Sequence, residues 1–132
     1  MDQGPLVIEE IDAGLELVRA FDQYQPVKTA FWVRASGEEQ RYLYIASEQI
    51  DDTNFDVAYG EVLRLADRMR IPYLDPFRVK LVGADDPLAR AAVDLHKRFP
   101  GSMATRFGGK SFGGLSIDDL YIYPSPLPAA VS

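Results

Sequence analysis

The stretch from 26 to 47 constrains the fold more than any other part of this sequence. Two runs of residues, 27–34 and 41–46, flank a polar turn at 36–39. Side chains alternate in character along both runs with a period of two, as they do when successive residues point to opposite faces of a strand. The pattern predicts an antiparallel β-hairpin. The face expected to meet the core carries Val27, Phe31, Val33, Leu43 and Ile45.

The opposite face of this hairpin combines aromatic and basic side chains. Trp32, Tyr42 and Tyr44 fall on it, and Lys28 and Arg34 flank them. Tyrosine, tryptophan and arginine are the side chains that dominate buried contacts between proteins. The alternation therefore predicts a contact surface as well as a strand pair.

Three segments outside the hairpin have helical spacing and three more are expected to be strands. Apolar residues recur at intervals of three and four in the helical segments, which gathers them on one side of a helix. The helices are expected at about 9–23, 53–70 and 86–99. The strands are expected at 77–82, 103–107 and 120–123, the last two joined by a glycine-rich link.

The order of these elements, α-β-β-α-β-α-β-β, indicates the α+β class. The hairpin requires antiparallel pairing, so we expect a single mixed, mainly antiparallel sheet of about five strands with three helices packed on one face. A chain of 132 residues fits one domain, 1–132. Its proline-rich tail, 124–132, is expected to be extended or frayed.

Helices on one face would leave the other face of the sheet open. On that basis, the alternation places a set of aromatic and basic side chains together on the open face. A slip of one residue in the register of any strand would reverse that strand's contribution. The predicted binding face consists of Trp32, Tyr42, Tyr44, Tyr121, Tyr123, Lys28, Arg34, Arg78 and Lys80.

Such a face has three physical interpretations. It can bind a second copy or another protein, it can stack the bases of single-stranded nucleic acid, or its aromatic residues can simply reflect strand propensity. The net charge of −6 disfavours nucleic acid. The preferred hypothesis is a small non-enzymatic interaction module that forms a homodimer or binds a protein partner.

The glycine-rich link supports a rival hypothesis, an enzyme or sensor that binds a phosphorylated small molecule. Arg106, Gly108, Gly109 and Lys110 form a possible anion-binding loop, because glycine backbone N–H groups can hold an anion. The segment lacks the full phosphate-loop pattern, since Ala104 stands where its first glycine is required. A hairpin tip or a pair of glycine bulges explains the glycines equally well.

The sequence offers little for catalysis. His96 is the only histidine and there is no cysteine, whereas metal sites usually take several nitrogen or sulfur ligands. The carboxylates occur as adjacent pairs at expected helix starts and turns, where they serve the helix dipole and the turn. We therefore expect no catalytic residue, no metal site and no cofactor.

The sequence also bears on location. Its first residues lack the basic start and apolar run of a signal peptide. No apolar stretch reaches the roughly 20 residues that cross a bilayer. We expect a cytoplasmic protein without membrane contact.

Overall fold

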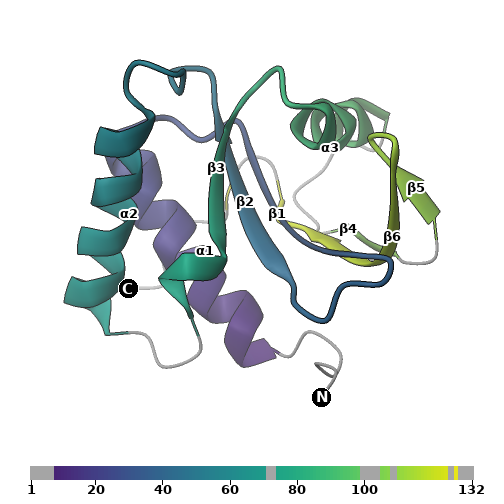
Figure 1. Ribbon diagram of the computed structural model, residues 1–132, viewed down its shortest axis with the longest axis horizontal. Helices are drawn as coiled ribbons and strands as arrows, with labels where there is room; N and C mark the ends of the chain where they lie inside the picture. Colours follow the sequence, from purple (N-terminus) through teal and green to yellow (C-terminus); the bar gives the residue numbers. More distant parts are fainter. Residues whose placement is uncertain (1–7, 71–73, 99–104, 108–109, 125–126, 128–132) are drawn as a thin grey trace.

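A single sheet runs through the centre of the protein, and helices cover both of its faces (Figure 1). The computed structural model describes residues 8–70, 74–98, 105–107, 110–124 and 127. Its helices are α1 (Ile8–Tyr24), α2 (Phe55–Met69) and α3 (Pro87–Arg98), and a short 3-10 helix, η1, spans Pro76–Arg78. Its strands are β1 (Thr29–Ala35), β2 (Tyr42–Ser47), β3 (Val79–Gly83), β4 (Thr105–Phe107), β5 (Lys110–Phe112) and β6 (Leu115–Ile122).

The strands lie in the order β3-β2-β1-β6-β4, and β5 also pairs with β6. Strands β2 and β3 are parallel, with α2 as the crossover between them, and the other described pairs are antiparallel. Because β4 and β5 pair with successive parts of β6 in one register, they act as one interrupted strand. The α+β class, the mixed sheet of about five strands and the order of elements are as the sequence predicts.

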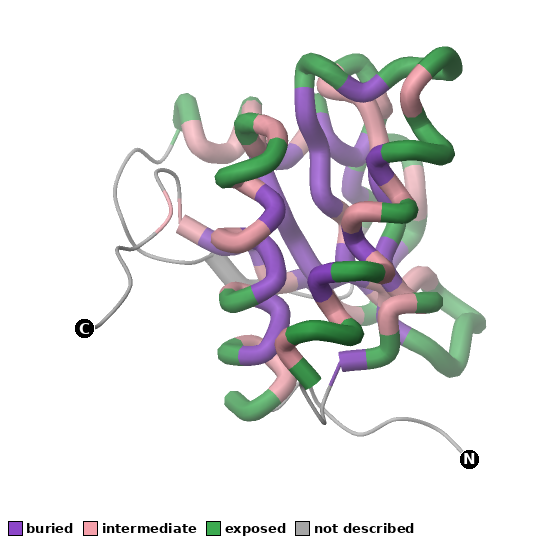
Figure 2. The backbone as a smooth tube through the Cα atoms, turned by 90° about the vertical axis from the view of Figure 1, so that its left-hand side faces the viewer, coloured by how far each residue is buried: buried purple, intermediate pink, exposed green. Residues whose placement is uncertain are grey.

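The prediction that all three helices pack on one face is wrong. Along β1, Ala30 and Trp32 belong to an apolar cluster with residues of α1 and α2, whereas Phe31 and Val33 belong to a cluster with residues of α3. Residues 29–33 of β1 are all buried, and Figure 2 shows that buried stretches of the chain gather in the interior of the molecule. A strand buried on both sides needs cover on both faces of its sheet.

The predicted tail, 124–132, can be compared with the structure only in part. Most of the predicted tail lies outside the described residues, since only Pro124 and Leu127 of 124–132 are described. Leu127 packs against the cluster shared with α1 and α2.

Within the described residues, no helix has the length and apolar character needed to cross a bilayer.

Helix α1 approaches the sheet closely at Gly14. A Cβ atom built there would collide with the hydroxyl oxygen of Tyr123 and lie 2.9 Å from Trp32 Nε1. Both aromatic side chains are buried in the cluster beneath α1. Glycine weakens a helix interior by roughly 0.5–1 kcal/mol relative to alanine. Its presence here is explained by the space that the two aromatic side chains occupy.

Replacing Gly14 with alanine is expected to destabilise the protein by about 1–3 kcal/mol, because overfilling the contact outweighs the gain in helix propensity. The matched control is Gly60→Ala in α2, where the new Cβ would meet nothing within 4 Å. The control is expected to stabilise by roughly 0.5–1 kcal/mol. Urea unfolding measures both free energies, and a stabilised Gly14→Ala variant would contradict the close approach of α1.

Candidate functional site

The register between β1 and β2 decides which side chains share a face of the sheet. Phe31 lies opposite Tyr44, and Trp32 lies opposite Leu43. Residues directly opposite one another in an antiparallel pair project from the same face. The sequence prediction placed Phe31 with Leu43, so it was wrong by one residue, and this error separates Trp32 from the two tyrosines of β2.

The placement of Trp32 and Tyr123 on an open face is therefore wrong, because α1 covers both. Trp32 is 3% exposed and Tyr123 is 1% exposed. Trp32 Nε1 donates a hydrogen bond of 2.9 Å to the Tyr123 hydroxyl, which donates one of 2.6 Å to the Ile11 carbonyl oxygen in α1. Burial raises the pKa of the Tyr123 hydroxyl above its ordinary value. Tyr121 is half-buried, and its ring packs edge to face on that of Tyr123.

Tyr42, Tyr44 and Lys80 do lie together, on the face that α3 partly covers. Tyr44 is level with Lys80 in the parallel pair β2–β3. Lys80 Nζ lies 4.4 Å from the centre of the Tyr42 ring and 5.7 Å from that of Tyr44. Tyr44 also stacks on the buried ring of Phe31, with 5.1 Å between ring centres. We call these three residues the tyrosine–lysine patch.

The other basic residues of the predicted face are dispersed. Arg78, in η1 just before β3, lies 3.8 Å from the Asp75 carboxylate. Arg34 lies 3.8 Å from Asp118, near the hairpin turn that joins β1 to β2. Lys28, just before β1, lies 3.4 Å from Glu48. The nine predicted residues thus form no single surface.

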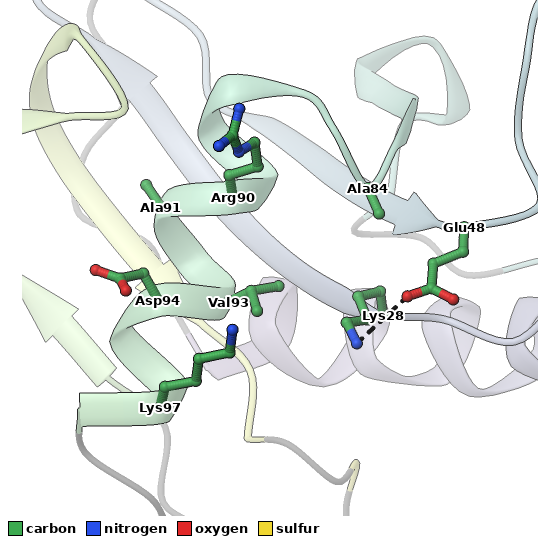
Figure 3. Close-up of a pocket in the computed structure, with 8 residues that line it drawn as sticks. All are labelled: Lys28, Glu48, Ala84, Arg90, Ala91, Val93, Asp94 and Lys97. Carbon is green, nitrogen blue, oxygen red and sulfur yellow. Dashed lines mark ion pairs between the residues drawn. The ribbon is translucent and has the colours of Figure 1, made fainter.

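Lys28 borders a shallow depression of about 530 Å³ beside α3 (Figure 3). Figure 3 shows Lys28 and Lys97 on opposite sides of it, with Val93 between them. The lining residues are Lys28, Glu48, Ala84, Arg90, Ala91, Val93, Asp94 and Lys97. Because Glu48 and Asp94 stand among the cations, the depression has mixed charge and does not select an anion.

The outer edge of β3 is the more distinctive surface. β3 ends the order of strands, and no described strand pairs with its outer side. Phe77, just before β3, is 76% exposed, and Phe55 at the start of α2 is 39% exposed. Phe55 stacks on Tyr59, whose hydroxyl donates a hydrogen bond of 2.9 Å to the Pro76 carbonyl oxygen and so ties α2 to η1. We call β3, Phe77 and Phe55 the β3 edge surface.

The sequence predicts that Phe77 begins a strand at 77–82, whereas in the structure it lies in η1, before β3. The turn of η1 precedes β3, with Asp75 accepting a hydrogen bond of 2.9 Å from the Phe77 backbone N–H. The Asp-Pro pair at 75–76 was the signal for this turn, because aspartate and proline favour turn starts. The free edge itself could not be read from the sequence, since strand order is not local information.

A groove of about 600 Å³ lies at the other end of β3, where α2 and α3 begin. Four carboxylates line it together with apolar residues. Two of them have structural roles: Asp86 accepts bonds from the backbone N–H groups of Leu88 and Ala89, and Asp51 accepts bonds from those of Thr53 and Asn54. The lining residues are Ile50, Asp51, Asp52, Phe55, Leu81, Val82, Gly83, Asp85, Asp86 and Pro87.

The predicted anion loop lies largely outside the described residues. Gly108 and Gly109 are not described, and only the backbone of Arg106 and Lys110 is placed, in β4 and β5. The next two glycines, 113 and 114, form a two-residue hairpin turn between β5 and β6, both with positive φ (59° and 84°). Such turns favour glycine. Anion binding by this loop stays a prediction from the sequence.

His96 has a structural setting on α3. Its Nε2 lies 3.5 Å from Thr29 Oγ1 at the start of β1, and its side chain is half-buried. Burial lowers the pKa of the imidazole below its ordinary value. Among the residues that the structure describes, no three metal-ligating side chains are grouped so as to hold an ion.

Comparisons of this chain with protein-family models, with curated protein sequences and with solved structures find no match. The geometry of the surfaces described above is therefore the basis for assigning a function.

Removing the Tyr123 hydroxyl is expected to destabilise the protein by about 1–3 kcal/mol, because Tyr123→Phe leaves the buried Trp32 N–H without its acceptor. The control is Tyr24→Phe, where the ring is 41% exposed and the change is expected to cost less than about 0.5 kcal/mol. Thermal unfolding compares the two. Equal stability of both variants would contradict the buried hydrogen-bond chain.

The stability of the fold is expected to fall as His96 becomes protonated. The pKa of His96 is lower in the folded protein than in the unfolded chain, so the unfolded chain binds the proton first as pH falls below about 6.5. His96→Gln should therefore make the free energy of unfolding less dependent on pH between about 7 and 5.5. Urea unfolding over this range tests it, and identical slopes would show that the imidazole is not desolvated.

Proposed function

We propose that the protein is a small, non-enzymatic interaction module that self-associates through the β3 edge surface. One observation carries the proposal: a large apolar ring, Phe77, stands exposed beside a strand edge that no described strand pairs with. An unpaired edge presents backbone N–H and C=O groups that a strand of another chain can satisfy. We place this module in the cytoplasm, as expected from the sequence.

The tyrosine–lysine patch supports the same assignment. Lysine on an edge strand usually discourages pairing, because its charge projects beyond the edge. Here the Lys80 ammonium lies above the face of the sheet, 4.4 Å from the centre of the Tyr42 ring, so it does not cover the backbone groups of the edge. The half-exposed rings of Tyr42 and Tyr44 add amphipathic surface next to the edge, as is common in protein interfaces.

Apolar burial gives the expected strength of the contact. Burying a phenylalanine side chain contributes about 1.5–3 kcal/mol. A contact between two identical copies uses the same patch on each, so each exposed ring counts twice. Phe77 and Phe55 from both copies would flank the paired edges and keep water from the strand contacts.

Phe77→Ser is expected to weaken self-association at least about tenfold, because two copies of the ring are lost from the contact. Sedimentation velocity over a range of protein concentrations measures the dissociation constant. The control is Tyr24→Ser, which removes another exposed aromatic ring outside the β3 edge surface. A wild-type chain that stays monomeric at every concentration, or equal effects of the two changes, would refute the proposal.

A further inference from the structure

Strand β3 has opposite charges at its two ends. Lys80 lies at its start and carries the charge of the tyrosine–lysine patch, whereas Arg78, just before β3, is paired with Asp75. Beyond its end, Asp85 and Asp86 line the groove together with Asp51 and Asp52. Asp52 and Asp85 are exposed and make no ion pair within the described part of the chain. The edge is therefore basic at one end and acidic at the other.

From this polarity we infer that a second copy pairs with β3 antiparallel, about a two-fold axis perpendicular to the sheet, and inserts its basic end into the acidic groove. The inference rests on the proposed self-association and adds the partner's orientation and the site that receives it. A parallel arrangement would set like charges against each other. The antiparallel one sets cations against carboxylates at both ends, as electrostatic complementarity favours.

The register that follows is consistent with the reach of the side chains. A two-fold axis perpendicular to the sheet keeps each face of one copy continuous with the same face of the other. A pairing centred on Leu81, the middle residue of β3, brings Lys80 level with Val82 of the second copy. Long side chains reach diagonal neighbours about 7–8 Å away, so the Lys80 side chain extends toward the turn that follows Gly83, where Asp85 and Asp86 lie.

The groove has the composition that a basic side chain needs. Its apolar lining includes Phe55, Leu81 and Val82, which suits the methylene stem of a lysine or arginine. Its carboxylates accept hydrogen bonds from the charged head. Both copies carry a net charge of −6. Screening over about 10 Å nevertheless lets the contacts at the edge outweigh the repulsion between distant charges.

Charge reversal on each side of the proposed contact tests it. Lys80→Glu and Asp85→Lys are each expected to weaken self-association at least about tenfold, because each homodimer then holds two repulsive contacts. An equimolar mixture of the two variants is expected to associate within about threefold of the wild-type affinity, since the heterodimer regains attraction at both ends. Sedimentation velocity measures the affinities, and native mass spectrometry with one variant tagged identifies the heterodimer.

The controls distinguish a failure of the antiparallel contact from a failure of the proposed self-association. Lys97→Glu on α3 makes the same charge change outside the edge and is expected to leave the affinity unchanged. Circular dichroism confirms that each variant is folded, and the mixture tests the contact even if one variant is less stable. A monomeric wild-type chain would refute self-association itself. A wild-type dimer whose affinity survives both reversals, or a mixture no tighter than the single variants, would refute the antiparallel contact alone.

Discussion

The hydrogen-bond chain from Trp32 through Tyr123 to α1 is the interaction on which the arrangement of the faces depends. It holds the face of β1 that carries Ala30 and Trp32 beneath α1. Gly14 allows the helix to approach this face closely, because it has no side chain there. Alternation then sends Phe31 and Val33 to the opposite face, where their burial needs α3. The tyrosine–lysine patch is the part of that second face that α3 leaves uncovered. The position of the tyrosine–lysine patch thus follows from the way α1 and α3 pack on the two faces of the sheet.

Much of the fold follows from local patterns in the sequence. The three helices, the hairpin and the strand before Gly83 have clear periodicity, and their order gives the class. Which side chains share a face of the sheet could not be predicted, because a shift of one residue in the register between β1 and β2 moves the side chains of one strand to the other face. The length of the turn after β1 sets that register, and turn signals at 36–41 do not specify it. The continuous apolar run at 30–33 was the available sign of a strand covered on both sides.

The candidate site was predicted only in part, for a related reason. Tyr42, Tyr44 and Lys80 come together because adjacent parallel strands place them side by side. Trp32 and Tyr123 were misassigned because an amphipathic ring suits an interface and a polar contact inside a core equally well. Phe77 was missed because the η1 turn rotates it away from the strand pattern. That β3 forms an edge is a property of the whole sheet, which no local pattern encodes.

The central claim is that two copies meet at the outer edge of β3. Hydrogen–deuterium exchange of individual backbone amides, compared at low and high protein concentration, tests it most directly. The account predicts that amides of β3 exchange more slowly at high concentration, because a second strand then protects them. Amides of β4 and β5, at the opposite end of the sheet, are predicted to exchange equally at both concentrations. Exchange in β3 that is independent of concentration while the mass doubles would contradict the claim.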